Sequence, residues 1–287
     1  MKKILAVFAA LAFAGAAGAA MLFDGSSNTV YKATTDNANV PLTQAGGVIT
    51  LTDNSPSANI SAAVFGNFNA TTLSNVGDTL TISFRINNIP PSSNTPLNIS
   101  LSGDRGVGVH NTDMGYSTFE RSYAGFKVTQ AIDTALNAVN FSRWNGGPAG
   151  NTTADRNILS GATNTAMGAY NTGTGVDRFD AVRTADITFS VVRASSTDFQ
   201  LAYTLNVSGG TGLQSFTSST YVPSGDNYFQ LNNALTTFAV GFAGTMDNGS
   251  VLNLSNLQVQ FIPEPGTLSF LLSASGLMLL GRKLRRG

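Results

Sequence analysis

A single histidine limits the catalytic chemistry open to this chain of 287 residues. His110 lies between Asp104 and Asp113, so a Ser-His-Asp triad would have to be built on these residues. No G-x-S-x-G elbow or comparable nucleophile context accompanies them. We therefore interpret His110 as a loop histidine. Loss of a hydrolase activity in His110→Ala would contradict that interpretation.

Glycoside hydrolysis would need two carboxylates on either side of the scissile bond. Between residues 21 and 262, Glu120 is the only glutamate, and no acidic residue is adjacent to it. The Glu-x-Asp-x-x-Glu pattern of sandwich glucanases is missing. A pair of aspartates stays open as an alternative.

Oxygen ligands make calcium the metal that best suits this composition, because the chain has no cysteine and so no thiolate zinc site. Asp177 and Asp180 follow the glycine-rich stretch Gly173–Gly175, whose carbonyls could complete a site. No D-x-[DN]-x-[DN]-G loop occurs, and aspartates are also common in turns for their local hydrogen bonds. Both readings stay open.

Aromatic side chains could stack on sugar rings and so form a carbohydrate site. Trp144, in the segment Arg143-Trp144-Asn145-Gly146-Gly147, is the leading candidate, with Tyr170 second. Packing inside a core or loop is the alternative role for Trp144. The other tyrosines considered are Tyr116, Tyr123 and Tyr221.

Alternation of apolar and polar residues predicts the strands that would hold these groups. Two of the runs flank a turn-like segment at residues 194–198 and predict a hairpin. In the last run the apolar phase shifts between Leu254 and Leu257, which predicts a bulge near Ser255-Asn256. The predicted strands are 80–86, 97–101, 187–191, 199–207, 238–242 and 252–261, with further candidates at 48–51, 63–68, 116–121 and 126–129.

The stretch 130–183 has few periodic runs and is expected to form long loops, with one or two helical turns around Ile132, Leu136 and Val139 as an option. No repeat or linker divides the body, residues 21–262. We predict an all-β fold, a two-sheet β-sandwich of the jelly-roll type that resembles the concanavalin and laminin-G class.

The N-terminus has the order of a secretory signal peptide. Lys2-Lys3 precede an apolar core from Ile4 to Phe13, and Ala17-Gly18-Ala19 is a small-residue cleavage site. We assign residues 1–20 to this signal. A permanent N-terminal anchor is the alternative, but the apolar core is shorter than a membrane span.

The C-terminal tail, residues 263–287, has three parts. Pro263-Glu264-Pro265 is an extended, non-helical strip. Seventeen uncharged residues lie between Glu264 and Arg282, at the lower limit of the roughly 17 to 25 that cross a bilayer as a helix. The chain then ends in a basic cluster that would stay on the cytoplasmic side. Its residues are Arg282, Lys283, Arg285 and Arg286. An uncut tail anchor and an amphipathic end on the membrane are the alternatives.

These parts, in this order at the C-terminus, resemble the PEP-CTERM sorting signal of Gram-negative bacteria. The resemblance covers residues 263–287 only. It implies that an exosortase, a membrane protease or transpeptidase, recognises Pro263, Glu264 and Pro265. It also implies transient anchoring in the inner membrane. The exported protein would end at the cell envelope, the outer surface or the extracellular matrix of cells that make biofilm and exopolysaccharide.

Without its two signals the body carries 10 basic and 15 acidic side chains, a net charge of −5. This charge argues against nucleic-acid binding, which needs clustered Lys and Arg. Lys32 and Lys127 are its only lysines. Our leading hypothesis is a secreted, non-enzymatic surface or matrix protein without a cofactor, unless calcium binds. The alternatives are a carbohydrate-binding module for exopolysaccharide and a secreted glycosidase or esterase.

Overall fold

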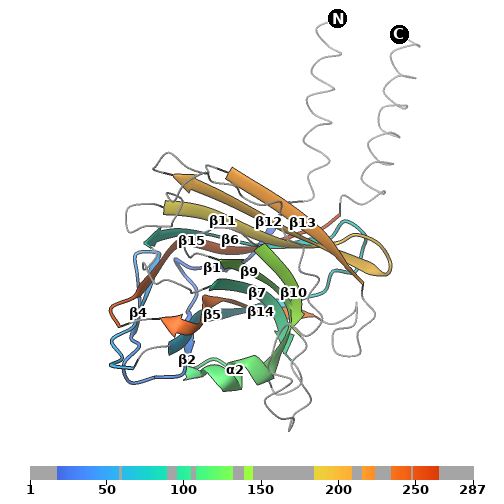
Figure 1. Ribbon diagram of the computed structural model, residues 1–287. Coiled ribbons are helices and arrows are strands. Elements are labelled where there is room, and N and C mark those ends of the chain that lie inside the picture. The colour runs from blue at the N-terminus through green and yellow to red at the C-terminus, as the bar shows by residue number, and fades with distance from the viewer. Residues whose placement is uncertain are drawn as a thin grey trace, which may run out of the picture.

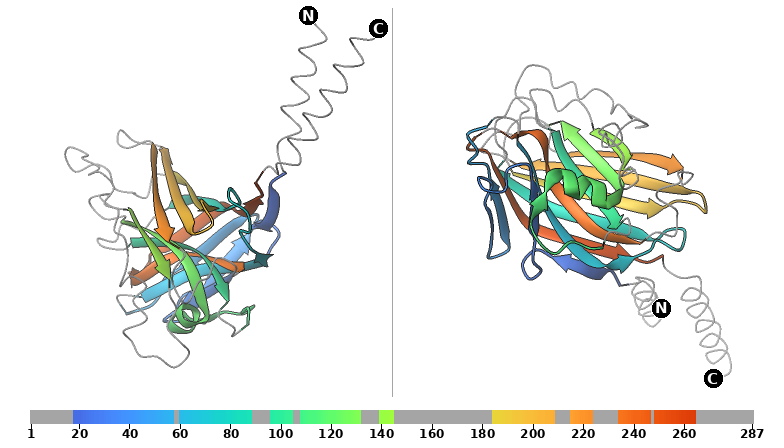
Figure 2. Two further views of the ribbon diagram at one scale, coloured as in Figure 1. Left: turned by 90° about the vertical axis from the view of Figure 1, so that its right-hand side faces the viewer. Right: turned by 90° about the horizontal axis from the view of Figure 1, so that it is seen from below.

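The computed structural model shows two stacked, almost entirely antiparallel β-sheets (Figure 1). The two-sheet, nearly all-β architecture predicted from the sequence is therefore confirmed. Figure 2 shows the same layers from two further sides. The described residues are 18–57, 60–88, 96–104, 108–131, 139–144, 184–208, 215–223, 234–246 and 248–264.

Sheet A is the larger layer. Its strands are β1 (Ala20–Asp24), β3 (Leu42–Ala45), β4 (Val48–Thr52), β6 (Thr79–Asn88), β11 (Thr184–Arg193), β12 (Asp198–Ser208), β13 (Ser215–Pro223) and β15 (Val251–Ile262). They lie in the order β13-β12-β11-β6-β15-β4-β3, and β1 pairs with β15 as well. The last strand of the body is thus in the interior of the sheet, with partners on both sides.

Sheet B lies against one face of sheet A. Its strands are β2 (Tyr31–Thr34), β5 (Ile60–Thr71), β7 (Pro96–Asp104), β8 (Met114–Gly115), β9 (Tyr123–Ala131), β10 (Val139–Trp144) and β14 (Leu235–Met246). They lie in the order β10-β9-β7-β14-β5-β2-β8. In both sheets a strand from the C-terminal part of the sequence lies between two N-terminal ones: β14 lies between β7 and β5, and β15 lies between β6 and β4. Neither sheet is therefore complete until its C-terminal strand has paired.

The main core fills the space between the sheets, because each strand places every second side chain on its inner face. On β6 the inner residues run from Leu80 to Ile86, as the alternation predicts. Those of β7 run from Leu97 to Leu101, and those of β14 from Phe238 to Phe242. All of them are buried. The strands predicted at 48–51, 63–68, 126–129, 187–191 and 199–207 are also present, within β4, β5, β9, β11 and β12.

The outer face of sheet A carries an exposed ion pair. Arg85 of β6 and Asp186 of β11 are cross-strand partners. Two hydrogen bonds of 2.7 Å join the guanidinium to the carboxylate, from Nε to Oδ1 and from Nη2 to Oδ2. The carboxylate accepts both bonds, which lowers the pKa of Asp186. Both side chains are more than two-fifths exposed, so water screens this pair.

The predicted hairpin and bulge are both confirmed. β11 and β12 pair from Thr184↔Ser208 to Arg193↔Phe199. On β15, the register with β6 shifts between Ser255 and Gln258. There Asn256 adopts a φ of 52°, the left-handed conformation that asparagine tolerates. This bulge lets β15 pair with β4 before the shift and with β1 after it.

Two sequence predictions were wrong. Residues 116–121 form no strand but lie in helix α2, Tyr116–Ser122. The apolar residues Tyr116, Phe119 and Tyr123 recur at the three- and four-residue spacing of a helix, and this spacing overrides the weak alternation. The expected loop region 130–183 contains strand β10, and Val139 begins that strand instead of ending a helical turn. Residues 132–138 and 145–183 lie outside the described residues.

Helix α2 lies on the outer face of sheet B and creates a second, smaller core there (Figure 1). Phe119 packs between Phe65 of β5 and Tyr123 of β9, with ring centroids 5.1 Å and 5.0 Å apart. Ala33, Met114 and Ala239 complete the buried set. The helix is therefore held on the sheet by aromatic packing. Within the described part of the chain, no helix is long and apolar enough to cross a membrane.

Candidate functional site

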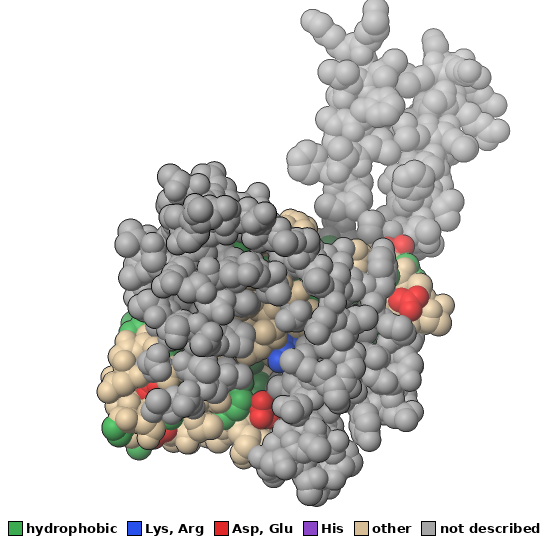
Figure 3. Space-filling model, in the orientation of Figure 1, with side chains coloured by type: hydrophobic (Ala, Val, Ile, Leu, Met, Phe, Trp, Pro, Cys, Tyr) green, Lys and Arg blue, Asp and Glu red, His purple; other side chains and the backbone are tan. Residues whose placement is uncertain are grey.

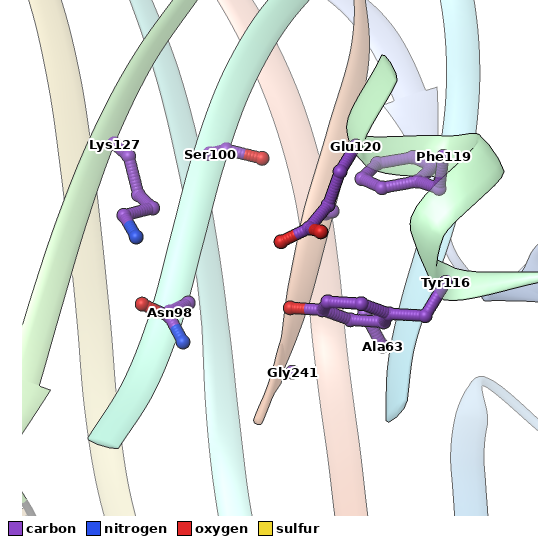
Figure 4. Close-up of a pocket in the computed structure, with 9 residues that line it drawn as sticks. Ala63, Asn98, Ser100, Tyr116, Phe119, Glu120, Lys127 and Gly241 are labelled. Atoms are coloured by element: carbon purple, nitrogen blue, oxygen red, sulfur yellow. The ribbon is translucent and has the colours of Figure 1, made fainter. Parts of the chain in front are cut away.

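A small pocket, partly open to solvent, lies where α2 meets the outer face of sheet B (Figure 4). One wall is the helix, and the floor is formed by the central strands β5, β7, β9 and β14. The lining residues are Ala63, Asn98, Ser100, Tyr116, Phe119, Glu120, Lys127, Ala239 and Gly241.

Small residues of β5 and β14 leave open space above part of the pocket floor. At Gly241 a Cβ atom would lie 2.3 Å from the Ala62 carbonyl oxygen and 2.3 Å from the Ala63 Cα, so no side chain fits. Ala63 and Ala239 are the other small residues of this floor. The pocket exists because the strands contribute backbone and methyl groups here, while α2 stands above them.

Polar residues of β7 and β9 form the rest of the floor. Ser100 pairs with Lys127, and Asn98 pairs with Thr129, so these side chains share the outer face. Thr129 Oγ1 donates a hydrogen bond of 2.8 Å to Asn98 Oδ1. This bond uses the amide oxygen and fixes the orientation of the Asn98 side chain. Strand alternation alone places these polar groups opposite the main core.

Lys127 is the most unusual group of the pocket. Its side chain is buried, at 6% exposure. No hydrogen bond or salt bridge connects its amine to any other described residue. Burial lowers the pKa of Lys127 from 10.5 to about 8, and the negative charge of Glu120 offsets part of that effect. The amine nitrogen is not among the fully buried polar atoms that lack a partner in the described residues, so water can reach it through the open side of the pocket. A ligand acceptor would replace that water.

Two groups of α2 face this amine. Figure 4 shows the Glu120 carboxylate and the Tyr116 hydroxyl reaching from the helix toward the side of the floor that carries Lys127 and Asn98. Tyr116 and Glu120 are four residues apart and therefore lie on one side of the helix. Burial, and then the charge of Glu120, raise the pKa of Tyr116. Its hydroxyl stays protonated and can both donate and accept a hydrogen bond.

His110 takes part in a structural network next to α2. Ser122 Oγ donates its only proton to the Thr118 carbonyl oxygen at 2.8 Å. His110 Nε2, 3.1 Å from that hydroxyl, must then be the donor. A nitrogen that donates to Ser122 cannot take its proton, so the pair is no nucleophile and base. Among the described residues, no hydrogen bond or salt bridge joins His110 to Asp104 or Asp113.

Lys32, the other lysine of the body, is buried as well, at 8% exposure. Its amine donates to the carbonyl oxygens of Asn37 and Val40 at 2.8 and 2.7 Å. Asp113 Oδ2 is 4.0 Å away. This lysine ties the loop after β2 to the edge of sheet B and has a structural role.

The sequence-predicted sugar and calcium residues fall mostly outside the described residues. Trp144 ends β10 instead of lying in a loop, and its backbone pairs with Gly125, two residues from Lys127 along β9. Its side chain, and Tyr170, Asp177 and Asp180, are outside the described set. No group of three or more His, Cys, Asp or Glu that could hold a metal occurs among the residues that are described. Calcium therefore stays a prediction.

The sorting motif begins directly after the last strand. Pro263 and Glu264 follow Ile262, and the Glu264 amide donates to Asp78 Oδ1 at 3.0 Å. Pro265, Arg282, Lys283, Arg285 and Arg286 lie beyond the described residues, as does the predicted membrane span.

Sequence reasoning considered Tyr116 and Glu120 singly and missed Lys127 as a site residue. The sequence does contain a hint of this site residue. Lys127 lies between the apolar residues Phe126 and Val128, in a body that has only one other lysine. Figure 3 shows how few charged side chains appear on the described surface of one face, which fits a chain with 11% charged residues. Buried charge in such a chain is a useful guide to a site.

Comparisons with known proteins give no family. No protein-family model matches the chain, and no curated protein matches it.

Solved structures resemble the chain only loosely. Lectin II from Ulex europaeus is 8% identical, with a TM-score of 0.44, and the match covers 86% of this chain and 98% of that one. The PL-14 alginate lyase from Aplysia kurodai is 14% identical, with a TM-score of 0.43, and the match covers 85% of this chain and 98% of that one. The CBM2 module of the evolved Dit of Lactobacillus casei BL23 phage J-1 is 12% identical, with a TM-score of 0.48, and the match covers 85% of this chain and 96% of that one. At TM-scores below 0.5 the strands superpose only coarsely, so fold and site rest on the geometry of the chain itself.

Proposed function

We propose that this chain is an exported, non-enzymatic protein of the cell surface or extracellular matrix that binds a saccharide in the pocket beside α2. Its fold is a jelly-roll, concanavalin-like sandwich in this proposal. One observation carries the binding function. The buried amine of Lys127 lacks a protein acceptor and faces a pocket that also holds the Glu120 carboxylate, the Asn98 amide and the Tyr116 hydroxyl.

The pocket chemistry suits sugar hydroxyl groups. A hydroxyl both donates and accepts, and the pocket offers a donor in Lys127, an acceptor in Glu120 and groups that do both in Tyr116 and Ser100. Pockets for small ligands usually combine a few such polar groups with apolar walls, and here Phe119 and Ala239 supply apolar surface.

The arrangement around His110 supports a role without catalysis. Its ring nitrogen donates to Ser122, which removes the histidine-dependent nucleophile. Glu120, the only glutamate of the body, has Lys127 and Tyr116 as its titratable neighbours in the pocket and no second carboxylate among the lining residues. A two-carboxylate glycosidase site is therefore not assembled from these residues.

Export and sorting belong to the same proposal. The signal peptide of residues 1–20 would deliver the chain across the inner membrane. The exosortase would then act at Pro263, Glu264 and Pro265, while the following span and the basic end of residues 282–286 hold the tail. The position of Pro263 supports this order, because the last strand ends at Ile262 and leaves Pro263 and Glu264 outside the sheet.

A glycan array tests the binding function. The secreted protein, purified from its exporting host, is expected to bind a subset of saccharides. Tyr116→Ala should weaken that binding about tenfold or more, because it removes an aromatic wall and a hydroxyl. Asn98→Ala should weaken it too, whereas Asn87→Ala, on the outer face of sheet A, is the matched control and should not. Absence of binding to every saccharide would contradict the proposal.

Trp144→Ala belongs in the same array, because its backbone lies near the pocket by register. A panel of chromogenic glycosides and esters checks the absence of catalysis. Turnover that disappears in Glu120→Gln would overturn the non-enzymatic reading and favour the glycosidase alternative.

Mass spectrometry of the mature C-terminus tests the sorting part. The expected product lacks the tail beyond the Pro263–Pro265 motif. A surface protein that retains Arg282 to Arg286 would show that the tail is a permanent anchor.

A further inference from the structure

We propose, on the basis of the proposed saccharide-binding function, that the pocket recognises a carboxylate-bearing sugar, a uronic acid, and that the Lys127 ammonium binds its carboxylate. Neither the sorting signal nor the fold requires this ligand class. The proposal follows from the missing acceptor of one basic side chain, Lys127.

The basic side chains of the described residues differ in how they are satisfied. Lys32 donates to two carbonyl oxygens, Arg85 to the Asp186 carboxylate, and Arg193 to the Leu73 carbonyl oxygen at 2.8 Å. Of the basic side chains that the structure describes, only Lys127 has no protein acceptor for any of its donors, although the Arg193 Nε is also buried without a partner. It is also more deeply buried than Arg85. An anionic ligand would supply the missing acceptor.

The negative group in the pocket does not replace such a ligand. Glu120 approaches the amine closely enough to affect its pKa, yet no salt bridge of 4.0 Å or less joins the two. A space therefore remains between the helix and the strand. A charge-assisted hydrogen bond from the ammonium to a carboxylate is about twice as strong as one between neutral groups.

A uronic acid fits the remaining groups of the pocket. Its hydroxyls can donate to the Glu120 carboxylate and accept from the Tyr116 hydroxyl, while the Asn98 amide is held in place by Thr129. The net charge of −5 on the body acts at longer range and is screened beyond about 8 Å at physiological salt.

The charge of Lys127 gives the binding a defined pH dependence. The pKa of about 8 means that the amine is protonated below this pH and neutral above it. Among the described residues, the titratable groups that face it are Glu120 and Tyr116, both on α2. Tyr116 stays neutral over the range from pH 7 to 9, because burial raises its pKa. Affinity for a carboxylate should therefore fall as the pH rises through 8, by up to about tenfold for each further pH unit.

The test compares an oligosaccharide that ends in a uronic acid with its carboxyl-reduced, neutral counterpart, by calorimetry on the secreted protein. We expect the wild type to prefer the uronate about tenfold or more at pH 7. Lys127→Met should lose that preference and bind both sugars like the neutral one. Lys127→Arg should keep the preference at pH 9, where the wild type loses most of it.

The outcomes separate the two proposals. Equal binding of the uronate and the neutral sugar by the wild type, unchanged in Lys127→Met, would overturn the uronate proposal and leave saccharide binding intact. No binding of either sugar would remove saccharide binding at this pocket and the uronate proposal with it. If Lys127→Met does not fold, the comparison of Lys127→Arg with the wild type at pH 9 decides the question.

Discussion

The two lysines of the body have similar burial and opposite surroundings. Lys32 lies at the edge of sheet B, on its inner face, and donates to two loop carbonyls. Lys127 lies on the outer face of the same sheet, under α2, and has no acceptor among the described residues. Burial of a lysine alone therefore does not reveal its role. The acceptors around the amine separate a lysine that stabilises the fold from one that awaits a ligand.

The largest effect should come from breaking the Lys32 contacts. Lys32→Met would leave the Asn37 and Val40 carbonyls without their donor, at a cost of about 4 kcal/mol in the free energy of unfolding. Urea-induced unfolding followed by tryptophan fluorescence measures this change. Lys32→Arg is the milder control, because it keeps the charge and the donors. A loss below about 1 kcal/mol would show that Lys32 is not structural.

Lys127→Met should change the free energy of unfolding in the opposite direction, toward a more stable protein. The folded state bears the cost of an ammonium whose pKa is lowered from 10.5 to about 8, so the variant should be more stable at pH 7, by at most about 3 kcal/mol. Between pH 8 and 10.5 the folded wild type loses its proton while the unfolded chain keeps it. The wild type therefore gains stability as the pH rises, and its difference from the variant shrinks.

Unfolding curves of both proteins from pH 7 to 10.5 measure that difference. The raised pKa of the buried Tyr203 lowers stability at high pH in both proteins and cancels in the comparison. Parallel stability curves would mean that Lys127 has a partner in solution.

A smaller effect is expected at His110, which supports the helix above the pocket. His110→Ala removes the hydrogen bond to Ser122 and should cost about 1 kcal/mol in thermal unfolding. Because Ser122 is in α2, saccharide affinity should fall severalfold as Tyr116 and Glu120 lose their fixed positions. A change in affinity without any change in stability would instead indicate direct ligand contact by His110.

The smallest effect is expected at the ion pair on sheet A. Arg85→Gln removes two hydrogen bonds of good geometry to Asp186, but both side chains are largely exposed. We expect a change in melting temperature close to experimental error, and none at high salt. This variant gives the baseline for an ionic contact on the surface, against which both buried lysines are compared. A drop as large as that of Lys32→Met would contradict the comparison.

Strand positions could be predicted from the sequence because alternation is a local property. Leu80 to Ile86 and Phe199 to Val207 follow the pattern closely, and the phase shift at Leu254 located the bulge at Asn256. The pocket could not be predicted for a related reason. Alternation puts Lys127 on the outer face of its strand, where solvent is the default neighbour.

Only α2 turns that outer position into a buried one, and the sequence pattern of residues 116–121 predicts a strand instead of this helix. Seven residues give too little periodicity to separate a helix from a strand with certainty. The packing of Phe119 on Phe65, which decides between them, joins residues far apart in sequence. The sugar site was instead expected at aromatic residues in 130–183, such as Trp144, because loops usually carry binding groups.

In the proposed sorting, the tail holds the chain in the membrane before the motif is cut, and the position of β15 then has a mechanical consequence. A pull on the chain beyond Ile262 enters at the end of a long strand in the interior of sheet A, bonded to β6 on one side and to β4 and β1 on the other. A pull directed along the strand would load its hydrogen bonds together instead of opening them one after another. A tethered molecule would therefore bear drag from flow or from a bound polymer through a strand that is paired along both of its sides.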